Sequence, residues 1–432
     1  MNEARLRAGG LKHPLLNPVP FDDRDGLSPD EAAVLAIIAN PTLRAVRDRQ
    51  GIASAQLFQA GILPNPRLSY NPETPVGGNT QGKVNAFGFG LGWDITSLIS
   101  RSARLDAAKA HASSVDLDVA WQEWQVAEAA RLHVYRLIIA EKRLIAAKQA
   151  ETSFQQLREG VNGGVALGVK TELDLSAAET SLQEAKSQAL AAQSAMDQER
   201  LALNRALGLP AEKMILMEKG VHPLLKQYPP VETLADDAET KRLDLLALKL
   251  GYESQEARVR VAVRSQFPKI NLGLTGGRDT DGVQTVGVGL SIDLPFFDRN
   301  QGHIAEERAT RKQLFDEYTT RLFEARADIA LIVTGMQATR QQIAGLGESL
   351  SALEILAENY RHAADAGQVE VFSYHKAVGS FYNKQIQIIE LEKNMFDLGI
   401  ALEIASGRYG LVSEKGRRAQ EHEQATGAEE PE

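Results

Sequence analysis

A short segment of strict alternation, GFGLGWDI at 88–95, constrains this chain more than any other feature of its sequence. Successive side chains of a strand point to opposite faces, so the segment has one bulky apolar face and one face of glycine and aspartate. In a soluble sandwich the outward face would carry charge. A large apolar face opposite a small one is typical of a barrel wall between lipid and water. The bulky residues are Phe87, Phe89, Leu91, Trp93 and Ile95.

The same pattern returns at 287–294, where the sequence is GVGLSIDL, and 287 − 88 = 199 residues separate the two copies. Thr285, Gly287, Gly289, Ser291 and Asp293 form its small and polar face. We therefore expect both bulky faces to contact lipid, and Asp94 and Asp293 to point into a water-filled lumen. The bulky residues of the second copy are Val286, Val288, Leu290, Ile292 and Leu294.

Long segments without glycine or proline surround these strands. None occurs from 101 to 159, where apolar residues recur at helical spacing, and we predict one long helix there. Four glycines at 160–168 predict the turn, and a second helix is expected from Thr171 to Leu207. It ends at Gly208-Leu-Pro210, a glycine-then-proline stop signal.

The first half begins with proline-rich residues 1–27, which predict an extended arm. Ser28-Pro-Asp-Glu31 is a capping box that starts a helix to about Ala39. Asn40-Pro41 starts a second helix to about Gly61. A strand at 67–71, a loop at 72–83 and the first alternating segment then make a hairpin at about 66–95.

The second half repeats this order. A helix at about 231–265, a strand at 267–274, a loop at 275–282 and the second alternating segment give a hairpin at about 267–294. Gly367 and Gly407 stand 199 residues after Gly168 and Gly208, because 367 − 168 = 199 and 407 − 208 = 199. This offset indicates an internal duplication. We assign an arm at 1–27, repeat 1 at 28–207, a linker at 208–238, repeat 2 at 239–410 and a disordered tail at 411–432.

Composition excludes several classes of function. The net charge of −9 makes nucleic acid an unsuitable partner. The absence of cysteine excludes disulfides, thiol chemistry, cysteine-bound metal and a lipidated cysteine. No apolar run approaches the ~20 residues of a spanning helix. The N-terminus has no secretory signal. Because a membrane barrel must be exported, we expect a leader to have been removed or the start to be misassigned.

Four short motifs stand out in the chain. They are Leu63-Pro-Asn-Pro66, Asp174-Leu-Ser-Ala-Ala-Glu179, Leu203-Asn-Arg-Ala-Leu-Gly-Leu-Pro210 and Pro295-Phe-Phe-Asp-Arg-Asn-Gln-Gly302. With these motifs, and in the order and duplication of its helices and hairpins, the chain resembles the TolC family of outer-membrane efflux channels. The resemblance covers roughly residues 28–410, and the stretch at 295–302 is most similar to the heavy-metal cation branch.

The resemblance implies a mainly α fold with a small β part. Four strands per chain would contribute to a twelve-stranded transmembrane β-barrel in a homotrimer. A long α-helical barrel would project into the periplasm, and residues 208–238 and the C-terminal segment would form a belt around it. An open sheet edge in lipid leaves backbone groups unpaired at several kcal/mol each, which also favours closure by several chains.

The resemblance further implies a passive exit duct of a tripartite RND-type efflux system. Substrate would arrive from an inner-membrane transporter through a periplasmic adaptor protein. Heavy-metal cations are one cargo, and drugs or a secreted polypeptide are alternatives that the sequence does not separate. A different hypothesis is a soluble helical scaffold with two hairpins, which does not explain why both hairpins set bulky residues opposite glycine and serine.

The lower ends of the long helices are the expected gate and adaptor-docking site of this family. Gly168 and Gly367 allow the chain to reverse there. Glu172 and Asp174 follow the first turn, and Glu370 follows the second. Some relatives have a pair of aspartates at the entrance, but the matching positions here are Ser373 and Lys376. Glu370 either replaces that acidic ring or simply complements the helix dipole.

Other candidate chemistry is weaker. Asp94 and Asp293 could form a ring of carboxylates that favours cations, or could accept local hydrogen bonds at the junction of barrel and helix. His362 and His375 flank the second turn, but solvated or packing roles suit them better than metal binding. The glycine-rich stretches lack the Gly-Lys-Ser/Thr of a phosphate loop. We therefore predict no enzyme activity, no cofactor and no metal site.

Overall fold

The computed structural model describes residues 13–16, 26–218, 228–365 and 370–408. The chain divides into two units. Unit 1 comprises Met1–Ala45, Ala120–Arg242 and Phe323–Glu432, and unit 2 comprises Val46–Val119 and Leu243–Leu322. Among the described residues, no helix has both the length and the apolar character that crossing a bilayer requires.

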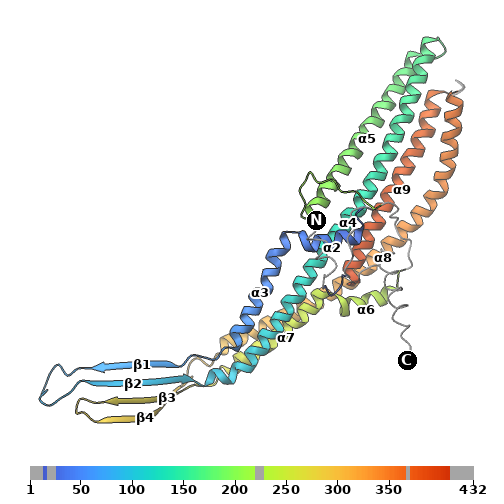
Figure 1. The fold of residues 1–432 in the computed structure, drawn as a ribbon. Helices are drawn as coiled ribbons and strands as arrows, with labels where there is room; N and C mark the ends of the chain where they lie inside the picture. Colours follow the sequence, from blue (N-terminus) through green and yellow to red (C-terminus); the bar gives the residue numbers. More distant parts are fainter. Residues whose placement is uncertain (1–12, 17–25, 219–227, 366–369, 409–432) are drawn as a thin grey trace, which may run out of the picture. The chain divides into compact units, whose positions relative to one another are not determined.

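A single antiparallel sheet of four strands lies within unit 2, in the order β1-β2-β3-β4 (Figure 1). Both alternating segments are strands, as the sequence predicts. The pairing of β2 with β3 joins the two repeats, with Phe87 opposite Arg278 and Asp94 opposite Asn271. The strands are β1 (Arg67–Glu73), β2 (Ala86–Asp94), β3 (Lys269–Arg278) and β4 (Gln284–Asp293).

The predicted loop at 275–282 is wrong at its beginning, because β3 continues to Arg278. Gly276 and Gly277 pair with Phe89 and Gly88 on β2, so a neighbouring strand satisfies their backbone groups. Gly277 also requires its small size, since a Cβ there would lie 2.6 Å from the Phe87 carbonyl oxygen. Glycine weakens an isolated strand, but here it permits the close approach of two strands.

The helical part of unit 2 is a layer of segments that contact one another in chain order. In α3, Gln50 Nε2 donates to Asp116 Oδ1 of α4 at 3.0 Å. In α7, Ser254 Oγ donates to the Ala107 oxygen of α4 at 2.8 Å. Gln255 Nε2 of α7 donates to the backbone oxygen of Glu307 in α8 at 3.0 Å. The order α3-α4-α7-α8 thus matches that of the strands. The bounds are α3 (Thr42–Gly61), α4 (Thr96–Ala166), α7 (Leu243–Arg264) and α8 (Gln301–Asp365).

Unit 1 contains the remaining helices, the part of α4 from Ala120 onward and the part of α8 from Phe323 onward. The predicted capping box is confirmed at α2, where Glu31 N donates to Ser28 Oγ and Ser28 N donates to Glu31 Oε2. Buried alanines, such as Ala130, Ala185 and Ala189, let neighbouring helices approach closely. The bounds are α2 (Pro29–Ala39), α5 (Glu172–Ala206), α6 (Val231–Lys241) and α9 (Val371–Ser406).

The helices also differ from the prediction in two places. The turn predicted at 160–168 is shorter, because α4 continues through three glycines to Ala166. Val161 packs in a buried cluster in this last part of α4, and that packing stabilises a segment that glycine weakens. The helix predicted at 231–265 is two helices separated at Arg242, whose ψ of 116° is extended. Packing against the end of α9 holds this break, as described below.

The linker and the two ends are only partly described. Residues 219–227 of the predicted linker, most of the 1–27 arm and the 411–432 tail lie outside the described residues. Within unit 1, Leu27 N donates to the Leu216 oxygen at 2.8 Å, and Glu218 N donates to the Leu27 oxygen at 3.2 Å. Asn204 Nδ2 holds the start of the linker by donating to the oxygens of Pro210, Ala211 and Lys213.

Candidate functional site

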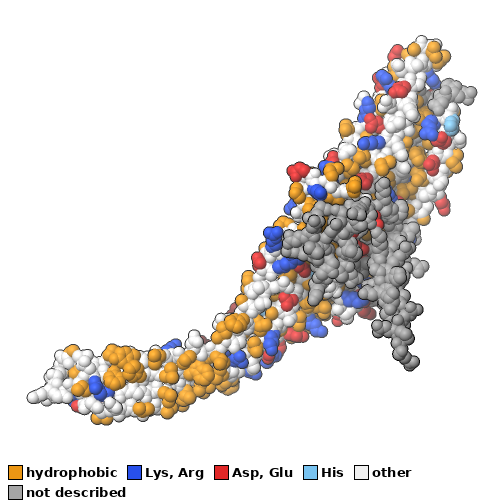
Figure 2. All heavy atoms as spheres, viewed as in Figure 1, with side chains coloured by type: hydrophobic (Ala, Val, Ile, Leu, Met, Phe, Trp, Pro, Cys, Tyr) orange, Lys and Arg blue, Asp and Glu red, His pale blue; other side chains and the backbone are white. Residues whose placement is uncertain are grey.

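The bulky face of the sheet is solvent-exposed to an unusual degree for apolar side chains. Figure 2 shows hydrophobic side chains gathered over the strands with few charges among them. Val286 is 91% exposed and Val288 is 73% exposed, whereas Phe87 is half-buried. The contiguity of such a surface indicates contact with another apolar phase or partner. The other exposed members of the face are Leu68, Tyr70, Phe89, Leu91, Trp93, Leu272, Leu274, Leu290 and Ile292.

Trp93 fastens the segment before β1 to this face. Its indole Nε1 donates to the Pro64 oxygen at 2.8 Å. The Leu63–Pro66 motif thereby lies against Leu91 and Leu272 and encloses an apolar groove of about 560 Å³. One of the family motifs thus contributes to the shape of the apolar surface.

The two aspartates that were predicted to face a lumen differ in their contacts. Asp94 Oδ1 accepts from Ser97 N at 3.2 Å, which is the local hydrogen bond at the start of α4 that one interpretation predicts. Asp293 is exposed and stands opposite Lys269 in the β3–β4 register. Whether these carboxylates also act as a ring depends on an assembly of chains, and the role of Asp94 and Asp293 in a lumen stays a prediction.

The tip between α4 and α5 is a tightly bonded turn. Gly168 has a φ of 70°, which suits glycine, and Val169 N donates to the Gly164 oxygen at 2.9 Å. Thr171 and Asp174 form a capping box in which the Thr171 Oγ1 and Asp174 Oδ2 atoms are 2.7 Å apart. Hydrogen bonds from the side chain and backbone of Thr171 hold the pKa of Asp174 below its ordinary value. Glu172 is exposed in the first turn.

The second tip lacks this cap. Gly367 lies outside the described residues. Glu370 is the N-cap of α9, and its side chain makes no capping hydrogen bond. By the repeat offset, Glu370 matches Thr171 (370 − 171 = 199) and Ser373 matches Asp174 (373 − 174 = 199). The acid and the hydroxyl have thus exchanged places. Lys376 is exposed and Ser373 is half-buried.

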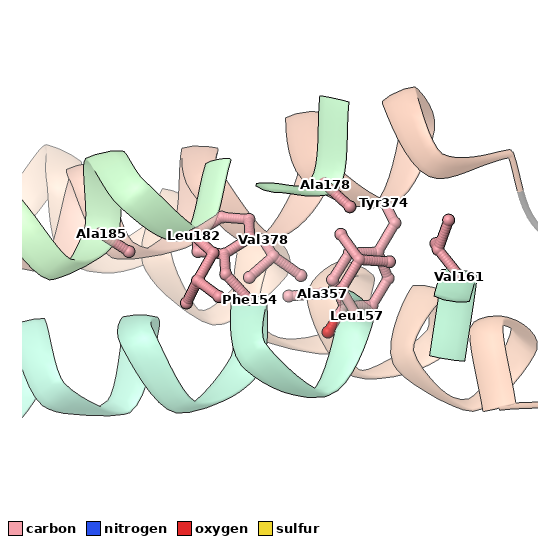
Figure 3. Close-up of a cluster of buried hydrophobic side chains, with 9 residues drawn as sticks. All are labelled: Phe154, Leu157, Val161, Ala178, Leu182, Ala185, Ala357, Tyr374 and Val378. Carbon is pink, nitrogen blue, oxygen red and sulfur yellow. The ribbon is translucent and has the colours of Figure 1, made fainter. Parts of the chain in front are cut away.

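A buried apolar cluster joins the four helices beneath the tips (Figure 3). Its aromatic members are Phe154 of α4 and Tyr374 of α9. Ser153 Oγ of α4 also lies 3.0 Å from the Tyr382 hydroxyl of α9. The complete cluster is Phe154, Leu157, Val161, Ala178, Leu182, Ala185, Ala357, Tyr374 and Val378.

The two histidines near the second tip do not form a metal site. His375 lies against the Phe154 ring, with 5.3 Å between ring centroids. His362 is mostly exposed and its Nε2 atom is 3.3 Å from Glu358 Oε1. Within the described parts of the chain, no three His, Cys, Asp or Glu side chains are placed to hold a metal ion together.

Exposed apolar side chains surround both tips. Leu167 is 81% exposed and Leu173 is 79% exposed at the first tip, while Phe372 is 69% exposed at the second. Figure 2 shows hydrophobic atoms at the end of α4 and α5, where the first tip lies.

Unit 1 also contains a buried ionic cluster that the sequence analysis does not identify. Arg131 Nη1 donates to both oxygens of Glu128, at 3.0 and 2.9 Å, and to Glu403 Oε2. Arg131 Nε is 3.4 Å from Asp30 Oδ1. The side chains of Arg131, Glu128 and Glu403 are 0% exposed. In the sequence this cluster is marked by a Glu and an Arg three residues apart in an alanine-rich stretch.

Burial dominates the electrostatics of this cluster. One guanidinium faces three carboxylates, and burial raises the pKa of Glu128 to about 8 despite the attraction of Arg131. Glu128 also accepts a hydrogen bond from Trp124 Nε1 at 3.0 Å. The cluster connects α2 and α4 of repeat 1 with α9 of repeat 2, and it therefore fixes how the two repeats pack within unit 1.

Two segments of the chain match the same protein family. Residues 33–209 and 234–408 each match the model of the family described as outer membrane efflux protein. The two matched ranges correspond to the two repeats and together cover more than half of the chain.

Individual relatives agree with this match. The chain is 24% identical over 304 residues to the cobalt-zinc-cadmium resistance protein CzcC of Cupriavidus metallidurans, covering 69% of this chain and 71% of CzcC. The chain superimposes on CusC with a TM-score of 0.72 at 17% identity, covering 92% of this chain and 98% of CusC. The CusC structures describe conformational changes that accompany folding and transmembrane channel formation.

The outer membrane protein VceC of Vibrio cholerae gives a TM-score of 0.73 at 18% identity, covering 88% of this chain and 96% of VceC. These structures confirm the mainly α, TolC-like fold with its small sheet. The family consists of efflux proteins, which confirms that the chain is not an enzyme. The duplicated helices and hairpins, together with both family matches, show that this chain belongs to the outer membrane efflux protein family.

Proposed function

We propose that this protein is the outer-membrane exit duct of a tripartite efflux system and conducts substrate passively from the periplasm to the exterior. The observation that supports this most is the sheet itself: four strands with β1 and β4 as unpaired edges and one bulky apolar face. In a bilayer, unpaired backbone groups at an edge cost several kcal/mol each. Closure with other copies removes both edges.

A homotrimer satisfies this requirement. Three chains with four strands each give a twelve-stranded barrel in which β1 of one chain pairs with β4 of the next. The small faces of the strands, with Gly92, Gly289 and Asp293, then surround an aqueous lumen. The bulky faces contact the outer-membrane lipid. This arrangement gives every strand two neighbours.

The tips are the proposed gate and docking site. Exposed Leu167, Leu173 and Phe372 offer apolar contacts to a periplasmic adaptor protein, which connects the duct to an inner-membrane transporter. Opening moves the ends of α4–α5 and α8–α9 apart, and Gly168, Glu172, Asp174, Gly367, Glu370, Ser373 and Lys376 belong to these ends. The uncapped start of α9 supports a role for the second tip in this movement.

Heavy-metal cations are the proposed cargo, because the curated relative CzcC is named for cobalt, zinc and cadmium resistance. Drugs or a secreted polypeptide are the alternative cargo for the same duct. A deletion strain is tested for metal and for drug resistance, with and without this chain. The class of compound to which the chain restores resistance identifies the cargo.

Assembly can be tested by crosslinking in a chain that has no cysteine of its own. Cysteine at Ser69 of β1, combined in turn with cysteine at 285, 287, 289 or 291 of β4, should give one pair that oxidises to a covalent trimer in detergent. Cysteine at Gly90 of the inner strand β2, combined with the same β4 positions, is the matched control and should not. A protein that stays dissolved and monomeric without detergent would exclude the duct and favour a helical scaffold.

The gate has a separate test. A disulfide between neighbouring chains across the tips should block export, and reduction should restore it. Export that continues through a verified crosslink would contradict a gate at the tips while leaving the barrel untouched.

A further inference from the structure

The helical layer of unit 2 contains a pocket of about 330 Å³ that no part of the proposed efflux function uses. All four helices of the layer contribute to its lining. Because every helix of the layer contributes to the lining, the pocket is a hollow of the layer as a whole. The polar residues of the lining are Gln56, Arg104, His111, Arg258, His303 and Glu307.

The lining of the pocket contains two arginines and one carboxylate. Glu307 is its one carboxylate, and this group is already engaged by Gln255 Nε2 and lies 3.5 Å from His303 Nε2. Arg104 donates to the Ser97 oxygen at 2.9 Å, but its buried Nε atom has no hydrogen-bond partner among the described residues. The lining is thus basic although the whole chain carries a net charge of −9.

The positive charge of Arg258 disfavours protonation of His111. No salt bridge joins Arg258 to a carboxylate within the described parts of the chain, and its positive charge acts on His111. Burial and this charge both lower the pKa of His111. An anion between the two side chains would offset the repulsion, because an opposite charge within ~4–6 Å favours the protonated imidazole.

We propose that this pocket binds a small oxyanion, the phosphate or carboxylate group of a solute. Guanidinium groups present several donors in a planar fork that matches the oxygens of such groups. The inference rests on the proposed function in one respect: it takes the pocket to open toward the bore of the duct. Three copies would then form a basic ring that passing anionic groups meet.

Binding is tested on the purified full-length protein in detergent by calorimetry with inorganic phosphate. We expect saturable binding that falls at least tenfold in Arg258→Gln and in Arg104→Gln. The matched control is Arg260→Gln, an exposed arginine two residues further along α7 that does not line the pocket, and it should bind as the wild type does. The pKa of His111, followed by NMR, should rise when phosphate is added.

Equal phosphate binding by all three variants, or an unchanged His111 pKa at saturation, would overturn the proposal. A water-soluble short-chain phosphatidylglycerol serves as a second ligand. If it binds and inorganic phosphate does not, the pocket is a lipid-headgroup site, and the proposal of a solute site is wrong.

Conductance in planar bilayers separates this inference from the proposed function. In a salt gradient, Arg104→Gln with Arg258→Gln should shift the reversal potential toward cation selectivity, and the Arg260→Gln control should not. A protein that binds phosphate but forms no pore would refute the duct and retain the pocket. A protein that conducts but binds no phosphate would refute the pocket and retain the duct.

Discussion

Arg131 Nη1 lies 3.0 and 2.9 Å from the two carboxylate oxygens of Glu128, and neither side chain is exposed to solvent. Because Glu403 and Asp30 share the same guanidinium, one positive charge holds together three helices from both repeats. The cost of removing a charge from such a cluster depends on which charge is removed, and this leads to two predictions.

Replacing Arg131 with methionine should destabilise unit 1 severely. The substitution removes the buried guanidinium that hydrogen-bonds Glu128 and Glu403, and breaking a buried pair in this way costs about 3–5 kcal/mol. Thermal unfolding of the purified protein measures the effect. Arg143→Met is the control, since Arg143 and Glu390 are about two-fifths exposed and an exposed pair contributes about 0–1 kcal/mol. Equal melting temperatures for the two variants would contradict this account.

Replacing Glu128 with glutamine should change how stability depends on pH. The folded-state pKa of Glu128, about 8, lies above its ordinary value of 4.5, so the folded protein holds a proton that the unfolded chain releases. This contribution to stability is complete below pH 4.5 and is lost as pH rises through about 8.

Over that interval the wild type should lose about 1.4 kcal/mol per pH unit relative to Glu128→Gln, which keeps a neutral side chain throughout. Unfolding by denaturant at pH 5 and pH 8 gives the comparison. Parallel pH profiles for the two proteins would show that Glu128 is ionised in the folded state.

Replacing Gly407 with alanine should destabilise the junction between α9 and α6. Gly407 has a φ of 69°, and a Cβ there would lie 2.8 Å from the backbone nitrogen of Arg242. Arg242 ends α6, donates to the Ala405 oxygen and lies over the Trp121 ring. We expect a loss of more than about 1 kcal/mol from backbone strain alone. Gly345→Ala is the control: it lies within α8, its Cβ would meet nothing within 4 Å, and stability should rise by about 0.5–1 kcal/mol.

Replacing Thr171 with alanine should loosen the first tip. Thr171 Oγ1 accepts from Asp174 N at 3.2 Å and completes the capping box, so its loss leaves amide groups at the start of α5 without partners. Hydrogen exchange of the first-turn amides of α5 should become faster. Thr180→Ala removes a hydroxyl from the middle of the same helix and should leave these amides unchanged.

Installing the same cap at the second tip should slow its opening. Glu370→Thr combined with Ser373→Asp recreates in α9 the residue order of the first repeat, Thr171 with Asp174. We expect slower hydrogen exchange at the start of α9 and reduced export by the proposed duct. Slower exchange with full export would separate the stability of this cap from gating.

Local sequence patterns determined much of this protein. The alternation at 87–95 and 286–294 predicted two strands, because side-chain direction along a strand has a period of two. The stretches without glycine and proline predicted the long helices, and the offset of 199 residues predicted the duplication that both family matches bear out. The helix start at Ser28 followed from capping chemistry, which involves only neighbouring residues.

Tertiary structure decided what depends on partners distant in sequence. Gly276 and Gly277 belong to a strand because β2 supplies their hydrogen bonds. The helix break at Arg242 is held by Gly407 at the end of α9, 407 − 242 = 165 residues later. Glu128 and Arg131 look like an ordinary exposed pair until α9 brings Glu403 to them. Burial and long-range pairing set the energies of these groups, and a local pattern contains neither.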